Sequence, residues 1–135
     1  YLNQDLSVLD KNKSLVENVM DIAGVRKHEA HAVLANFGFR GDETVKRVGV
    51  LSGGELLKAT LAVVLGGENQ PDLLILDEPT RNFSPLSNPV IRQMLRNFQG
   101  AILTVSHDRK YIAEVADTVY ELTENGLVLQ KNSLV

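Results

Sequence analysis

The sequence predicts an α/β domain in which a small helical subdomain lies beside a mainly parallel sheet that is followed by a hairpin. Two short apolar runs, residues 73–76 and 101–105, are bounded by turn-forming residues, as expected for strands buried on both faces of a parallel sheet. Before and between these runs, apolar residues recur at helical spacing. Near the C-terminal end, Asn125-Gly126 separates two strand-like runs and is the strongest short signal for a hairpin turn.

Length and composition restrict the class of protein. At 135 residues the chain fits one domain with a sizeable core, and 44% hydrophobic with 23% charged residues is ordinary for a globular protein. A net charge of −3 gives no electrostatic footprint for nucleic acid over the chain as a whole. A ribosome or a membrane-protein partner, reached through a part outside this stretch, stays open.

The absence of cysteine excludes disulfides and thiolate metal sites and suits a reducing compartment, so we expect a cytoplasmic protein. No apolar run is long enough to cross a bilayer and no signal peptide is visible, so we expect no insertion into a membrane. The chain begins with Tyr1 in the middle of a strand-like pattern. We therefore expect a piece of a longer protein.

Two helices without an intervening strand are predicted in the first part of the chain. Ser14 and Glu17 have the spacing of a capping box, and Gly24 is placed to end the helix that they begin. A second helix is predicted over residues 27–37, where apolar side chains again recur at helical spacing. A charged, glycine-punctuated connection follows. The helical subdomain is therefore predicted to extend from about residue 5 to about residue 50.

A glycine-rich helix start follows this subdomain. Ser52 and Glu55 again have capping-box spacing, and they enclose Gly53 and Gly54 in the first helical turn. Each glycine costs about 1 kcal/mol of helix stability relative to alanine, which makes sense if a ligand approaches the backbone closely. The N–H groups of a helix N-terminus bind phosphate well. The alternative is a glycine-rich cap without a ligand.

The first apolar run leads directly into two adjacent carboxylates, Asp77 and Glu78, and Pro79 then stops it. Neighbouring carboxylates repel each other, and their desolvation is costly unless a cation or a hydrogen-bond donor compensates. Ligands of open α/β sheets bind just beyond the carboxyl ends of the strands, which is where this pair falls. The pair is interpreted as one carboxylate that holds Mg²⁺ and one that handles a water molecule. The alternative is an acidic turn.

The second apolar run leads into His107, and Asp108 is placed to cap a short helix after it. Pro89 suits the first turn of a helix that reaches to about Phe98, before this strand. A lone histidine at the end of a strand is more often structural than catalytic.

In order and spacing these pieces resemble the ATP-binding cassette (ABC) ATPases, which have a P-loop NTPase-type fold. Residues 51–55 resemble the signature motif of that family, residues 73–78 resemble its Walker B strand, and His107 resembles its switch histidine. Gln4 stands where the family has its Q-loop glutamine. The resemblance covers nearly the whole chain. It implies a partial cassette in which residues 51–135 form the half with these three motifs.

The resemblance implies one ATP site with Mg²⁺. Asp77 would hold the Mg²⁺ on the nucleotide phosphates, and Glu78 would be the general base that activates the attacking water. His107 would contact the γ-phosphate and this water, and its position after the Walker B strand favours this role over a structural one. Gln4 would sense both Mg²⁺ and the γ-phosphate. Positioning and charge neutralisation are what phosphoryl transfer requires.

The resemblance also implies a second cassette as a partner. The signature motif, in which we include Ser52, Gly53, Gly54 and Glu55, would bind the γ-phosphate of an ATP held by the opposite cassette. ATP would then lie between the two cassettes.

One motif of the family is missing from these 135 residues. The phosphate loop G-x-x-x-x-G-K-[ST] does not occur, and there is no Gly-Lys pair anywhere in the chain. Because the amides and the lysine of that loop supply most of the binding energy for ATP, the isolated chain is expected to bind ATP weakly and to hydrolyse it negligibly. Calorimetric titration checks this, and micromolar affinity for Mg-ATP would contradict it.

Residues 106–111, Ser-His-Asp-Arg-Lys-Tyr, resemble the run typical of ABC-F proteins, which are soluble tandem-cassette ATPases that act on the ribosome. This implies a translation factor or an antibiotic-resistance protein. Two positions depart from the family: Ser84 replaces the aspartate of the D-loop, and Lys58 stands where an arginine is usual after the signature. A transporter cassette with a transmembrane partner and a non-catalytic regulatory cassette stay as alternatives.

Overall fold

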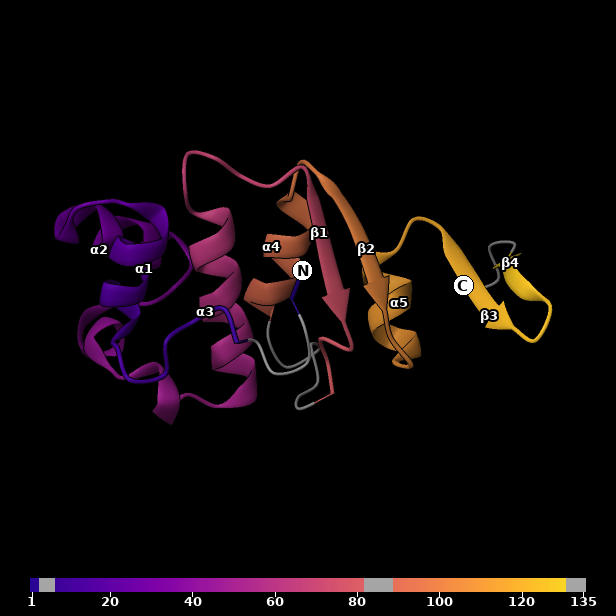
Figure 1. Ribbon diagram of the computed structural model, residues 1–135, viewed down its shortest axis with the longest axis horizontal. Coiled ribbons are helices and arrows are strands. Elements are labelled where there is room, and N and C mark those ends of the chain that lie inside the picture. Colours follow the sequence, from indigo (N-terminus) through magenta and orange to yellow (C-terminus); the bar gives the residue numbers. More distant parts are fainter. Residues whose placement is uncertain (3–6, 82–88, 131–135) are drawn as a thin grey trace.

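The computed structural model describes residues 1–2, 7–81 and 89–130, and Figure 1 shows a group of helices at one end, a two-stranded parallel sheet in the middle and a hairpin at the other end. In chain order the elements are α1 (Leu15–Ala23), α2 (Lys27–Asn36), the 3₁₀ helices η1 (Gly41–Val45) and η2 (Val48–Val50), α3 (Gly53–Leu65), β1 (Leu73–Asp77), α4 (Pro89–Asn97), β2 (Ala101–Val105), α5 (Arg109–Val115), β3 (Val119–Thr123) and β4 (Gly126–Gln130).

Helix α1 begins where the capping box predicts. The hydroxyl of Ser14 accepts from the N–H of Glu17 at 3.2 Å, and the Glu17 carboxylate accepts from the N–H of Ser14 at 2.7 Å. Gly24 ends the helix with a φ of +66°, a left-handed conformation that glycine adopts without steric cost. Because both signals are local, the sequence predicted the helix and both of its ends correctly.

The connection after α2 is more ordered than the sequence indicated. It folds into η1 and η2, and it returns to the start of α1 through an isolated antiparallel bridge between Ser14 and Arg47. The N–H of Val48 donates to the carbonyl of Lys13 at 3.0 Å. These backbone bonds attach the connection to α1.

The parallel sheet is present as predicted. Strands β1 and β2 pair in register from Leu73 opposite Ala101 to Asp77 opposite Val105. On the other edge of β1, Leu2 forms a parallel bridge with Leu76. The strand-like pattern at the start of the described residues thus corresponds to a single bridge at Leu2.

The expectation that both strands are buried on both faces is wrong. In β1 only Leu74 and Leu76 are buried, whereas the side chain of Leu73 is 49% exposed. In β2 no residue is fully buried, and Leu103 and Val105 are 57% and 58% exposed. The alternation of burial along each strand means that the described helices cover one face of the sheet only.

The hairpin forms, but its turn lies one residue earlier than predicted. Thr123 pairs with Gly126, so Glu124 and Asn125 form the loop and Gly126 is the first residue of β4. Gly126 has a φ of +105°, whereas neither loop residue has a positive φ. The glycine is therefore needed directly after the two-residue loop and not within it.

Two adjacent glycines at the end of α3 give a test of how this helix packs. A Cβ added to Gly66 would lie 2.3 Å from Cγ1 of Val33 in α2 and 2.5 Å from the carbonyl oxygen of Ala62. A Cβ added to Gly67 would meet nothing within 4 Å. Gly66→Ala is therefore expected to lower the free energy of unfolding by about 1–3 kcal/mol. Urea denaturation measures this, with Gly67→Ala as the matched control. Equal stability of the two variants would contradict the packing.

Candidate functional site

The two adjacent carboxylates lie at the carboxyl end of β1. The N–H of Glu78 donates to the carbonyl of Val105 at 2.9 Å, which extends the pairing of the two strands by one residue. Glu78 has a φ of +46°, and it is the one non-glycine residue with a positive φ in the described part of the chain. Such a conformation costs about 1–3 kcal/mol and turns the chain sharply at this carboxylate.

His107 lies next to Glu78. Its Nε2 atom is 3.5 Å from Oε1 of Glu78, and the two groups form an ion pair when the imidazole is protonated. The imidazole is 98% exposed and the Glu78 side chain is 18% exposed. A ligand from solvent therefore reaches the histidine freely, while the carboxylate lies deeper in the protein.

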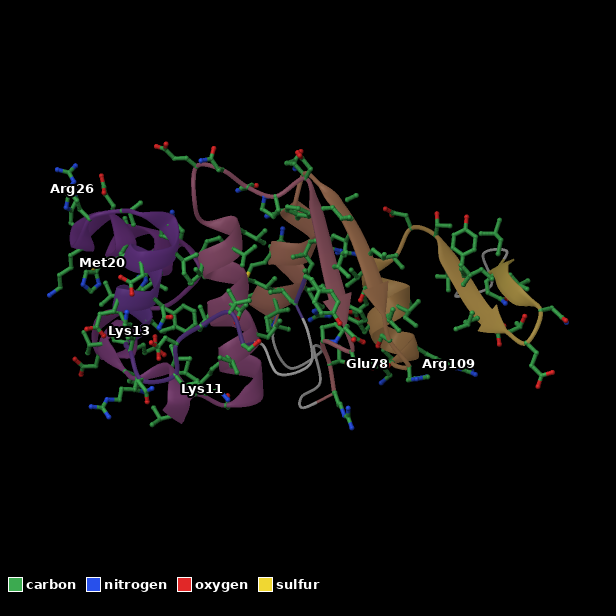
Figure 2. All side chains as sticks on the ribbon, in the orientation of Figure 1. Lys11, Lys13, Met20, Arg26, Glu78 and Arg109 are labelled. Atoms are coloured by element: carbon green, nitrogen blue, oxygen red, sulfur yellow. The ribbon has the colours of Figure 1, made fainter. Side chains whose placement is uncertain are left out.

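The segment that carries His107 is held by local hydrogen bonds. Asp108 caps α5, because its Oδ1 accepts from the N–H groups of Lys110 and Tyr111, both at 3.0 Å. The N–H of Asp108 in turn donates to the hydroxyl of Ser106 at 3.0 Å. The end of β2 and the start of α5 thus fix the backbone on both sides of the histidine. Figure 2 shows Glu78 at the lower end of β1 and Arg109 at the adjoining start of α5.

Asp77 has a partner that sequence reasoning missed. The hydroxyl of Tyr1 donates to Oδ2 of Asp77 at 2.9 Å. This hydrogen bond is the main reason why the pKa of Tyr1 is raised, so the phenol keeps its proton and acts as the donor. The pairing of Leu2 with Leu76 brings the two residues together. No local signal in the sequence could have revealed the contact.

The start of α3 has the predicted form. The Ser52 hydroxyl accepts from the N–H of Glu55 at 3.3 Å, and the Glu55 carboxylate accepts from the N–H of Ser52 at 3.0 Å. The N–H groups of Gly53 and Gly54 belong to the first helical turn, which has no intrahelical acceptors for them. This end of the helix can therefore donate two amide hydrogen bonds and one hydroxyl hydrogen bond to an anion.

The chemistry of the donors fits Mg²⁺ on a nucleotide better than a metal cage. Within the described residues, no group of three or more His, Asp or Glu side chains could hold a metal ion. The Oδ2 atom of Asp77 accepts the hydrogen bond from Tyr1, so its other carboxylate oxygen, Oδ1, is the one that this residue can offer to a metal ion. Mg²⁺ is commonly bound by one or two carboxylates together with phosphate oxygens and water, and this arrangement suits a single aspartate.

The structure thus joins some of the predicted residues and separates others. Asp77, Glu78 and His107 come together at the ends of β1 and β2, whereas no hydrogen bond or ion pair within the described ranges joins them to residues 52–55. The N-terminal end of α3 lies at the same lower side of the molecule as the carboxyl ends of the two strands (Figure 1). Gln4 and Ser84 lie outside the described residues.

Comparison with known proteins gives three kinds of match. The sequence profile of the family described as "ABC transporter" matches residues 1–81. Among curated proteins, the chain is 36% identical over 132 residues to ATP-binding protein Uup of Haemophilus influenzae, covering 93% of the chain and 20% of that protein. It is 33% identical over 120 residues to ABC transporter F family member 2 of Arabidopsis thaliana, covering 88% and 17%. The chain thus spans about a fifth of the length of these relatives.

Two solved structures share the fold. The structure of cbiO1 from Clostridium perfringens, part of the ABC transporter complex cbiONQ, matches with a TM-score of 0.73 and 25% identity and covers 97% of this chain and 55% of its own. A dimeric ATP-binding cassette in a post-hydrolysis state with ADP and Pi matches with a TM-score of 0.68 and 18% identity, covering 91% of this chain and 58% of its own.

None of the helices that the structure describes is both long enough and apolar enough to span a membrane.

Proposed function

This chain belongs to the ABC transporter family, and we propose that it carries the catalytic carboxylate and the signature motif of an ATP-hydrolysing cassette of ABC-F type. The observation that carries the proposal is the pair of strand ends that hold Glu78 and His107 with 3.5 Å between Oε1 and Nε2. Two titratable side chains from neighbouring strands meet there, within reach of one water molecule.

Each residue of this site has a proposed role. Asp77 would hold the Mg²⁺ of Mg-ATP, and Gln4 would sense the same ion. When bound, Mg²⁺ neutralises part of the phosphate charge. Glu78 orients the attacking water and takes its proton, and the exposed His107 donates to the γ-phosphate. The carboxylate of Glu78 already lies 3.5 Å from the imidazole of His107, so the two groups need little rearrangement when ATP binds.

The signature residues serve a second ATP. The amides of Gly53 and Gly54, which have no acceptor within the helix, and the hydroxyl of Ser52 suit a γ-phosphate that arrives from outside the cassette, because no contact joins them to Glu78 within the described residues. We propose that this phosphate belongs to an ATP bound by a second cassette. The dimeric structural neighbour supports an arrangement of two cassettes.

Two observations favour the ABC-F branch and hence the ribosome as the target. The string of residues 106–111 has the branch's Ser-His-Asp-Arg pattern, and a relative at 33% identity is an ABC transporter F family member. The protein would then act as a translation factor or as a ribosome-protection factor in antibiotic resistance. A transporter cassette is the second candidate, supported by the neighbour that is part of an ABC transporter complex.

Sedimentation of the full-length protein separates the two candidates. The Glu78→Gln variant with ATP is expected to co-sediment with ribosomes on a sucrose gradient, and the same variant with ADP is expected to remain near the top. Recovery of the ATP-bound variant in washed membranes, and not with ribosomes, would favour the transporter cassette. Lack of ATP binding by the full-length protein would contradict both.

A further inference from the structure

Helix α3, which begins with the signature residues, also makes a contact that has no assigned role in the proposed ATP site. The ammonium group of Lys58 in α3 lies 4.1 Å from the centroid of the Phe39 ring. Phe39 is only 3% exposed, so the ring is a fixed part of the core. A cation at this distance from an aromatic ring is attracted by the negative face of the ring.

The end of α2 sets the position of this ring. The N–H of Phe39 donates to the carbonyl of Leu34 at 2.9 Å, and the N–H of Gly38 donates to the carbonyl of Ala35 at 3.1 Å. Together with a φ of +87° at Gly38, this is the Schellman motif that ends many helices. The lysine lies close to this turn, since its Nζ is 3.6 Å from the place that a Cβ of Gly38 would take, an ordinary contact distance.

Helix α3 is thus held against the end of α2 at two positions. One is Lys58 on Phe39, and the other is Gly66, which packs against Val33 and Phe37. At 1.5 Å per residue, these positions are about 12 Å apart along the helix. Lys58 lies one helical turn after Gly54, so its contact with Phe39 restrains α3 next to its first turn, which contains Gly53 and Gly54. Gly66 acts at the opposite end.

We propose that Lys58 is a positioning residue: its contact with Phe39 fixes the direction of the first turns of α3, so that Ser52, Gly53 and Gly54 meet the γ-phosphate of the opposite cassette's ATP. This inference rests on the proposed function. The helical part of the chain thereby sets how tightly two cassettes close on ATP. The ammonium group of a lysine is sufficient for this role, because attraction to the face of a ring requires only a positive charge. The paired donors of an arginine guanidinium are not needed.

The test measures retention of ATP by the full-length protein in a Glu78→Gln background, in which ATP is expected to remain bound between the cassettes. Lys58→Met keeps the length of the side chain and removes its charge. It is expected to shorten the half-life of retained, labelled ATP by about two- to fivefold, the factor that corresponds to the lower end of the energy of a cation–π contact. Phe39→Leu is expected to do the same, and adding Lys58→Met to it should have no further effect. Lys58→Arg is expected to restore retention.

Two controls separate positioning from stability. Gly66→Ala disturbs the same helix pair at its far end, so it is expected to lower the urea midpoint without changing retention. Lys13→Met removes another lysine contact, the ion pair with Asp21 at 2.6 Å, and is expected to leave retention unchanged. Figure 2 shows Lys13 in the helical part of the chain.

The outcomes are distinguishable. Unchanged retention in Lys58→Met, or equal shortening in Gly66→Ala and Lys58→Met, overturns the positioning role and leaves the ATPase assignment intact. Failure of the Glu78→Gln background itself to retain ATP overturns the proposed function and the positioning role with it.

Discussion

Replacement of Glu78 by glutamine in the full-length protein is expected to lower ATP turnover by about 10²–10⁴-fold while ATP stays bound. The amide has nearly the same size and shape as the carboxylate, but it cannot take a proton from water. The unusual backbone is expected to persist, since the N–H of Glu78 still donates to the carbonyl of Val105 at 2.9 Å. Turnover is measured as phosphate release, and binding is measured as the amount of labelled ATP retained after gel filtration.

A matched substitution distinguishes loss of the base from loss of charge. Glu124→Gln removes one carboxylate from the loop between β3 and β4, far along the chain from the strand ends, and is expected to leave turnover within about twofold of the parent, as surface changes usually do. Asp77→Asn is expected to differ from both, because it weakens the binding of Mg-ATP. Hydrolysis at the parent rate in Glu78→Gln would contradict the role of this carboxylate as general base.

The helix starts were predictable because the signals that make them are local. Ser14, Ser52 and Asp108 each accept from backbone N–H groups two to three residues ahead, so a short stretch of sequence contains both partners. The order of the two strands and their polar ends also followed from local patterns. The parallel pairing then placed the ends of β1 and β2 side by side.

Other features depend on tertiary structure and leave no pattern in the sequence. The hydrogen bond from Tyr1 to Asp77 joins residues 76 positions apart. The contact of Lys58 with Phe39 requires both the glycine turn after α2 and the packing of α2 on α3. Apolar composition also could not reveal that Leu103 faces outward. A run of apolar residues looks the same in the sequence whether the protein covers one face of the sheet or both faces.

The second large effect is expected from His107→Ala, which removes the imidazole that lies 3.5 Å from the carboxylate of Glu78. Turnover should fall by about 10²-fold, the usual loss when one donor to the developing phosphate charge is removed. ATP binding should change little, because the imidazole is 98% exposed and the fold does not depend on it. Phosphate release and the retained amount of labelled ATP again measure the two quantities.

His28 provides the matched control for this variant, since it lies exposed on α2, in the helical part of the chain. His28→Ala is expected to keep the parent turnover. If His107→Ala also kept it, the distance of 3.5 Å between Nε2 and Oε1 would be a contact without a role in hydrolysis. Glu78 would then have to position the water alone.

A loss of turnover in both Glu78→Gln and His107→Ala, with no further loss in the double variant, is the result expected of two groups that act on one water molecule.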